Sequence, residues 1–171
     1  RNLANEKVYV DPQLGRLVQN YRTGFVRLSI SHYLNKDFQK AEAALLKMEE
    51  IMPSSIIPIP SKQLQYQIAQ VYSGVGNQAK MKYHMKELVE RKDLLLEDYI
   101  LYGKTFIQLL EDYDESKLIF ETIYQNYKLI EQSILRRGFT ATKISEKEWQ
   151  DWQQSLPEII YLLFLSYKNL E

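Results

Sequence analysis

The sequence predicts an all-α fold, and three observations lead to this prediction. Apolar residues recur every three or four positions rather than at alternating positions, which is the spacing of one helix face. Only 6 glycines and 5 prolines interrupt the 171 residues. Asp and Ser residues stand at several points where an apolar-periodic segment begins, as helix N-caps do. We therefore expect consecutive helices joined as antiparallel hairpins.

The first helix is predicted over residues 11–35. The Asp11 side chain can accept hydrogen bonds from the first-turn amides, and Pro12 has no amide hydrogen to leave unpaired. One apolar stripe follows this helix and is formed by Leu14, Leu17, Val18, Tyr21, Phe25, Leu28 and His32. Because His32 lies on this stripe, we interpret it as a core or boundary residue rather than a ligand. A second helix is predicted over residues 37–53, ended by its final proline.

Residues 53–60, PSSIIPIP, contain three prolines and are predicted to be non-helical, with their isoleucines against the body of the protein. Ser61 is predicted to cap a third helix, which ends at the glycines of residues 74–77. A fourth helix follows. A fifth is expected over about residues 95–110, and a sixth begins after the acidic turn at 112–114. These six helices form three hairpins.

The C-terminal part begins with a polar, Thr-rich connector, residues 136–144. Two S-x-x-E capping boxes follow, at residues 145–148 and 155–158, and Pro157 supports a helix start in the second. The last helix is predicted over about residues 156–170. Its apolar run is nearly continuous, so we expect it to be buried on most sides.

The three hairpins share a pattern that resembles the tetratricopeptide repeat, in which large apolar and small residues recur at fixed positions of each helix pair. The matching residues are Phe25, Leu28, Ser29, Ala41, Leu45, Met48 and Pro53, then Gln65, Ile68, Ala69, Tyr72, Met81, Met85 and Leu88, then Ser116, Phe120 and Ile123. In the third hairpin Gly103 lies one residue out of place, so we expect its first helix to be shifted.

The resemblance implies hairpins stacked as a right-handed superhelix with extra C-terminal helices, because one hairpin cannot cover its own apolar face. We expect one domain over residues 1–171, with repeat units at about 12–53, 61–92 and 95–130, a connector at 136–144 and capping helices at 145–170. A helical bundle without superhelical stacking is the alternative.

Repeat domains of this kind usually bind an extended peptide or a partner helix on a concave face. Here the expected groove is formed by Thr23, Val26, Arg27, Ile30, Tyr33, Gln63, Tyr66, Gln67 and Gln70. Family members that bind the C-termini of chaperones use Lys and Asn at the positions of Val26, Ile30, Tyr66 and Gln70, and none is retained here, so that activity is excluded. The alternative is that this surface packs on the rest of a larger protein or on the final helix.

Composition and motifs exclude several other function classes. The absence of cysteine excludes disulfides, thiolate metal sites and a cysteine nucleophile. The 22 basic residues balance 22 acidic ones without a local basic cluster, so no nucleic-acid binding is expected. The longest apolar run, Ile159–Leu165, is shorter than the ~18 residues that a bilayer-spanning helix needs. His32 and His84 are isolated, and no catalytic motif occurs, so we predict no catalytic, cofactor-binding or metal-binding residue.

A second resemblance covers about residues 8–68. It rests on VYVD at 8–11, NYR at 20–22, KAEAAL at 40–45 and MP at 52–53 followed by IP pairs. These are similar to the soluble C-terminal region of multi-spanning bacterial membrane proteins of the Bacteroidetes and Chlorobi lineage, described as protein O-mannosyltransferase-like. The resemblance implies a location on the extracytoplasmic, periplasmic side of the inner membrane, with the transfer chemistry in the membrane portion. Without it, a cytoplasmic location is expected.

We therefore expect a non-catalytic protein-interaction or scaffold domain, cut from a longer membrane protein. Its partner would be a protein, a peptide or the membrane portion of the same polypeptide, and no cofactor is expected. One alternative is a domain that positions substrate for a membrane-embedded glycosyltransferase in the same polypeptide. A second is a free-standing cytoplasmic adaptor.

Overall fold

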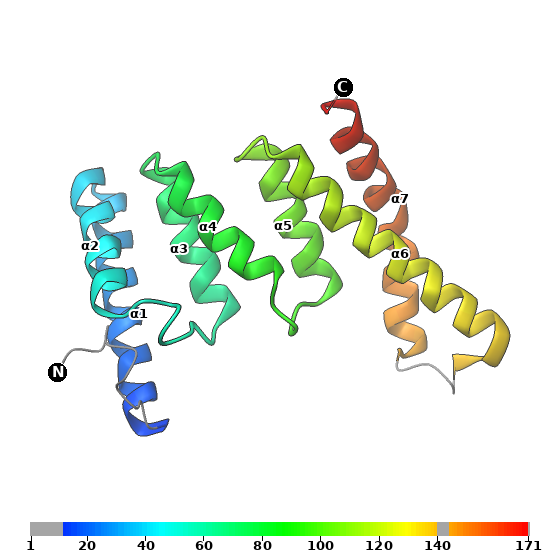
Figure 1. Ribbon diagram of the computed structural model, residues 1–171, viewed down its shortest axis with the longest axis horizontal. Coiled ribbons are helices and arrows are strands. Elements are labelled where there is room, and N and C mark those ends of the chain that lie inside the picture. The colour runs from blue at the N-terminus through cyan, green and yellow to red at the C-terminus, as the bar shows by residue number, and fades with distance from the viewer. Residues whose placement is uncertain (1–11, 140–143, 171) are drawn as a thin grey trace. The chain divides into compact units, whose positions relative to one another are not determined.

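The computed structural model describes residues 12–139 and 144–170, and these parts contain helices and turns but no strand (Figure 1). The helices described there are α1 (Pro12–Leu34), α2 (Phe38–Ile51), α3 (Lys62–Gly74), α4 (Gln78–Val89), α5 (Leu96–Gln108), α6 (Tyr113–Arg137) and α7 (Glu146–Lys168). The all-α prediction is confirmed. The predicted cap Asp11 lies outside the described residues, as do residues 140–143 of the predicted connector.

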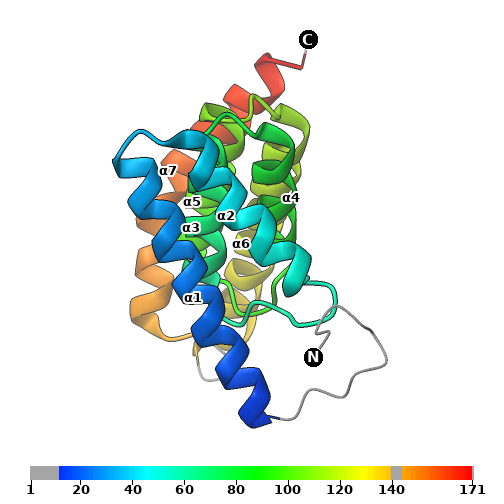
Figure 2. The same ribbon diagram turned by 90° about the vertical axis from the view of Figure 1, so that its left-hand side faces the viewer.

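The chain divides into two compact units, unit 1 (Arg1–Glu90) and unit 2 (Arg91–Glu171). Unit 1 holds two antiparallel hairpins, α1–α2 and α3–α4, which pack through α1 and α3 and through α2 and α3 (Figure 2). Unit 2 holds the hairpin α5–α6, and α7 packs on both of its helices. The three predicted hairpins are thus present. In the described part of the chain, no helix combines the length and the apolar character that crossing a bilayer requires.

The three hairpin turns share one local design. A residue with left-handed backbone comes first, with φ of 60° at Lys36, 85° at Gly76 and 49° at Glu111. The next residue is an N-cap, Asp37, Asn77 or Asp112, whose side chain accepts a hydrogen bond from the amide three residues later. Each cap satisfies one amide that the helix itself leaves unpaired, so these residues fix where the second helix of each hairpin begins.

The third turn is one residue longer than the other two. The amide of Asp112 donates to the carbonyl of Phe106, six residues earlier, whereas the corresponding bonds of the first two turns span five residues. This extra residue accounts for the apparent one-residue displacement of Gly103 in the sequence pattern. In the structure Gly103 faces α6 directly, because a Cβ atom placed on it would lie 2.5 Å from the ring of Phe120.

The proline-rich segment, residues 53–60, is non-helical as predicted and packs against the helices of unit 1. Ile57 and Ile59 are buried, and the Ser61 side chain accepts a hydrogen bond from the amide of Leu64 at the start of α3. The two predictions about this segment, its buried isoleucines and its Ser61 cap, are therefore confirmed. Two of its carbonyl groups accept hydrogen bonds from a buried arginine of α1.

That arginine is Arg22, whose side chain is almost fully buried. Its Nη2 donates to the carbonyls of Met52 at 2.8 Å and Ile57 at 2.5 Å, and its Nη1 donates to the carbonyl of Pro58 at 3.1 Å. Burial lowers the pKa of Arg22, and the negative charge of Glu87 acts in the opposite direction. The guanidinium thereby replaces the hydrogen bonds that a non-helical segment cannot make internally.

The interior-facing side of α1 differs from the predicted stripe. The residues that are buried on this helix are Val18, Arg22, Val26 and Ser29. Of the seven stripe residues only Val18 is buried; Tyr21 is 61% exposed, and Leu17 and Leu28 are each 49% exposed. The hydroxyl of Ser29 donates to the carbonyl of Ala41 at 2.6 Å. Two small residues thus set the close approach of α1 and α2, and they rotate the larger apolar side chains outward.

The C-terminal region contains one long helix rather than two helix starts. The first capping box forms: the side chain and the amide of Ser145 pair with the amide and the side chain of Glu148. The second does not form, because α7 runs through Pro157 without interruption. A proline deprives the carbonyl four residues earlier of its bond. Here that residue is Gln153, which is exposed, so water can solvate its carbonyl.

The prediction that the last helix is buried on most sides is wrong. On its apolar segment Ile159, Leu162 and Ser166 are buried, whereas Ile160, Tyr161 and Phe164 are 47%, 61% and 62% exposed. Because α7 packs only on one side against α5 and α6, a nearly continuous apolar run leaves part of its surface uncovered in unit 2.

Candidate interaction surface

The structure distributes the nine residues of the predicted groove between surface and interior. Arg27, Gln63, Gln67 and Gln70 are exposed, Thr23, Ile30, Tyr33 and Tyr66 are half-buried, and Val26 is buried. Val26 is 1% exposed and so contributes to the core of unit 1 rather than to a surface. The ring of Tyr33 lies 5.6 Å from that of Phe38 and packs over Gly74 of α3.

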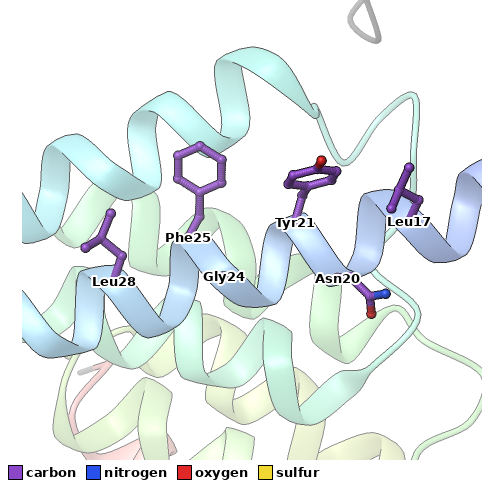
Figure 3. A pocket seen from close by; sticks show the side chains of 6 residues that line it. All are labelled: Leu17, Asn20, Tyr21, Gly24, Phe25 and Leu28. Carbon is purple, nitrogen blue, oxygen red and sulfur yellow. The ribbon is translucent and has the colours of Figure 1, made fainter.

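A hollow of about 360 Å³ lies instead on the outward side of α1 (Figure 3). Its wall consists of Leu17, Asn20, Tyr21, Gly24, Phe25 and Leu28. The four large apolar side chains project from the same side of the helix, and Gly24 leaves a gap between them. A Cβ atom on Gly24 would meet no atom within 4 Å, so the space above this residue is open.

The spacing of these six residues has a specific geometric meaning. Residues 17, 20, 21 and 24 stand at i, i+3, i+4 and i+7, and residues 21, 24, 25 and 28 repeat the same spacing. Four residues in this arrangement form the hole that receives one side chain of a neighbouring helix in knobs-into-holes packing. The six residues therefore have the spacing of two consecutive holes on one helix, separated by about one helical turn, or ~6 Å.

The charged side chains that α1 itself places beside the hollow are positive. α1 contains no Asp or Glu over its 23 residues. Arg16 and Arg27 are exposed, and neither forms an ion pair with any residue that the structure describes. They are eleven residues apart, so they lie on the same flank of the helix, three turns or ~16 Å from one another. The apolar hollow is thus bordered on one side by two cations that have no ion-pair partner among the described residues.

A second group of interest is a polar cluster inside unit 1, centred on Glu49 of α2. Its carboxylate accepts hydrogen bonds from the Tyr72 hydroxyl at 2.8 Å, the Lys80 ammonium at 2.5 Å and the His84 Nε2 at 2.8 Å. These partners come from α3 and α4, so one carboxylate joins three helices. His84 is itself buried, and its ring stacks on Tyr72 with 5.7 Å between centroids.

The protonation behaviour of this cluster follows from its contacts. Burial alone would raise the pKa of Glu49, but the hydrogen bonds from His84, Lys80 and Tyr72 outweigh burial and lower the pKa to about 2. Burial and the Glu49 charge together raise the pKa of Tyr72 well above its usual range. At neutral pH the cluster therefore holds a carboxylate and a neutral phenol.

The chemistry of the cluster is that of a structural clamp. Both oxygens of Glu49 are engaged by donors of the protein itself, so the carboxylate serves to hold three helices together. The second nitrogen of His84, Nδ1, has no hydrogen-bond partner among the described residues, and the nearest acid is Glu87 at 3.9 Å. Within the described residues, no group of three or more His, Cys, Asp or Glu side chains is arranged to hold a metal ion.

Sequence reasoning missed both the hollow and the cluster. Glu49 and His84 are separated by 35 positions, and no local spacing relates them, so His84 is isolated when only the sequence is considered. The α1 hollow has a visible signal, the apolar stripe, but the same pattern is typical of a buried helix face. Comparisons with protein-family models, with curated proteins and with solved structures found no match to this chain.

Proposed function

We propose that this chain is a non-catalytic protein-interaction domain, made of helical hairpins arranged like tetratricopeptide repeats, that binds a partner through the outward face of α1. The observation that carries the proposal is the apolar hollow over Gly24. Its large side chains Leu17, Tyr21 and Leu28 are exposed, and contiguous exposed apolar surface of this kind is typical of protein-binding sites.

The repeat-like part of the proposal is supported by the equivalence of the hairpins. Each returning helix begins with the same cap chemistry, and the one-residue insertion in the third turn brings Gly103 into register with Ser29 and Ala69 of the first two hairpins. A role beside a membrane-embedded glycosyltransferase of the same polypeptide, the alternative that the second resemblance implies, rests on sequence resemblance alone.

Filling the hollow tests the function directly. The photoreactive residue benzoylphenylalanine is placed at Tyr21, and the chain is irradiated with a protein extract of its native cell. We expect a covalent adduct of defined mass. The substitution Gly24→Leu should remove the adduct, because a leucine side chain occupies both holes while its Cβ meets no atom of unit 1. A Gly residue in a helix interior also costs ~1 kcal/mol relative to Ala, so this variant should fold at least as well.

The matched control is Gly15→Leu, the same change on the same helix at a position outside the hollow, where a Cβ also meets no atom. It should leave the adduct unchanged. Adducts that persist in Gly24→Leu but appear equally from a probe at Gln67 would assign binding to the predicted groove instead. A purified chain that transfers or hydrolyses a substrate would overturn the non-catalytic part.

A further inference from the structure

We infer that the occupant of the α1 hollow is an α-helix of a separate protein, with apolar residues on one face and acidic residues on one flank. This inference rests on the proposed function and names its partner class. Two observations carry it, the shape of the hollow and the charge beside it.

The shape selects a helix over an extended peptide or a lipid surface. Both parts of the hollow have the four-residue arrangement that accepts a helix side chain, and the holes follow one another along α1. An extended strand would instead need unpaired backbone groups for pairing. The backbone groups of α1 are used within the helix. A membrane surface favours a protruding apolar face with many cations, whereas here the apolar surface is hollowed at Gly24 (Figure 3).

The charge selects an acidic flank on the partner. Arg16 and Arg27 lie on one border of the hollow, and no described acid neutralises them. When a helix docks along α1, water is removed beside these guanidinium groups, and an unpaired cation near an interface then costs affinity. Carboxylates on the facing flank of the partner relieve that cost and form bidentate bonds with arginine. Their spacing should match that of the two arginines, about eleven residues or three turns.

Selection from a display library tests this inference. The library presents 18-residue helices with fixed leucines at i, i+4, i+7 and i+11 and with Glu, Gln or Lys varied at the flanking positions. The complete chain is the target. We expect Glu to be enriched at least tenfold over Lys at two flank positions about eleven residues apart. A variant with both Arg16→Glu and Arg27→Glu should enrich Lys at the same positions, because both side chains are exposed and their change leaves the fold intact.

A selected helix is then synthesised with a fluorophore, and its Kd is measured by anisotropy. We expect the Kd to rise at least tenfold in the double arginine variant and to rise with salt. We expect no binding to Gly24→Leu and unchanged binding to Gly15→Leu. Equal enrichment of Glu and Lys would overturn the inference. If Gly24→Leu still abolished binding in that case, the proposed interaction function would stand and only the acidic partner would fail.

Three other outcomes would also overturn the inference. Selection of no helix at all would exclude a helical partner. Concentration-dependent dimers in sedimentation that Gly24→Leu abolishes would make a second copy of this chain the occupant. Binding to anionic phosphatidylglycerol vesicles that is lost in Gly24→Leu would make the occupant a membrane surface. In the last two cases the hollow would still be the functional surface, so these results differ from a failure of the proposed function.

Discussion

The interiors of the two units are polar in different ways. In unit 1 the buried polar side chains include Arg22, Gln65 and His84, and each bonds to an element far away in the sequence. In the part of unit 2 that the structure describes, the polar residues that are buried as a whole are Thr105, Ser116 and Ser166, and each carries a hydroxyl.

The bonding of these groups explains the difference. Thr105 and Ser166 donate to the carbonyl four residues earlier on their own helix, and Ser116 pairs with Ser166 at 2.9 Å. The first two bonds stay within one turn of a helix, and of the three only the Ser116–Ser166 bond joins distant segments, α6 and α7. In unit 1, by contrast, the proline-rich loop and three helices depend on side chains for their hydrogen bonds. A loop that cannot pair with itself requires donors from elsewhere, and these must be buried where they act.

The largest expected effect is that of Arg22→Met in unit 1. The change removes the donor of the carbonyls of Met52 and Ile57, and it leaves the carbonyl of Pro58 with Gln19 alone. We expect a loss of about 3–5 kcal/mol, the range for breaking a buried charged group from its partners. Amide hydrogen exchange of α3 and α4 measures it.

The control for that variant is Arg27→Met, an exposed arginine on the same helix, which should change stability by less than about 0.5 kcal/mol. Both tryptophans, Trp149 and Trp152, belong to unit 2, so their emission reports that unit separately. An Arg22→Met chain whose α3 and α4 amides stay as protected as before would show that the segment needs no buried donor.

The second effect is a pH dependence of the stability of unit 1, which contains Glu49. The folded pKa of Glu49 is about 2, below its ordinary value of 4.5, so the folded state binds this proton less readily than the unfolded state. The stabilisation is therefore complete above about pH 4.5 and is lost as pH falls towards 2. We expect a loss of up to about 3 kcal/mol over this interval, since one pKa unit corresponds to about 1.36 kcal/mol.

Exchange measured on unit 1 between about pH 5 and 2 checks this prediction. Glu49→Gln should destabilise unit 1 at neutral pH and reduce the further loss of its stability as the pH falls from about 5 to 2. Glu50→Gln, the same change at an exposed position of the same helix, should leave the loss of stability at acidic pH unchanged, because among the described residues Glu50 forms its ion pair with Lys47 at the surface. An identical acid dependence in the wild type and Glu49→Gln would mean that other carboxyls dominate.

The smallest effect compares one substitution in the two units. Gly103→Ala places its Cβ 2.5 Å from the ring of Phe120, and Gly74→Ala places its Cβ 2.5 Å from the ring of Tyr33. Phe120 is fully buried, whereas Tyr33 is half-buried and has room to turn. We expect Gly103→Ala to cost about 1–3 kcal/mol, as overpacking does, and Gly74→Ala to cost less than about 1 kcal/mol.

Chemical denaturation followed by tryptophan emission for unit 2 and by exchange for unit 1 gives both values. The double variant Gly103→Ala with Phe120→Leu tests the cause, because a smaller side chain at position 120 makes room for the added methyl. It should couple favourably, so that the pair costs less than the sum of the single changes. Additive costs would show that the two residues do not meet.

Local chemistry made the hairpins predictable from the sequence. Asp37, Ser61 and Asp112 cap helices through amides three residues away, and proline at residue 53 ends α2 where expected. These signals act within one turn and need no information about the rest of the chain. The second capping box does not form because α7 continues through Pro157. A helix tolerates an internal proline when the carbonyl that the proline leaves unpaired is at the surface.

The sequence by itself thus determined the helical class, the hairpin boundaries and the caps at Ser61 and Ser145, because each depends on residues within a few positions of one another. Only the tertiary structure decided which side of α1 is buried. Either the stripe of large apolar residues or the row containing Arg22 and Ser29 could have faced the interior. The row with Arg22 and Ser29 is buried because Ser29 allows close approach to Ala41 and because Arg22 donates hydrogen bonds to the carbonyls at and after the end of α2. The apolar stripe that was left outside became the candidate binding surface, and the pairing of Glu49 with His84 likewise required the packed helices.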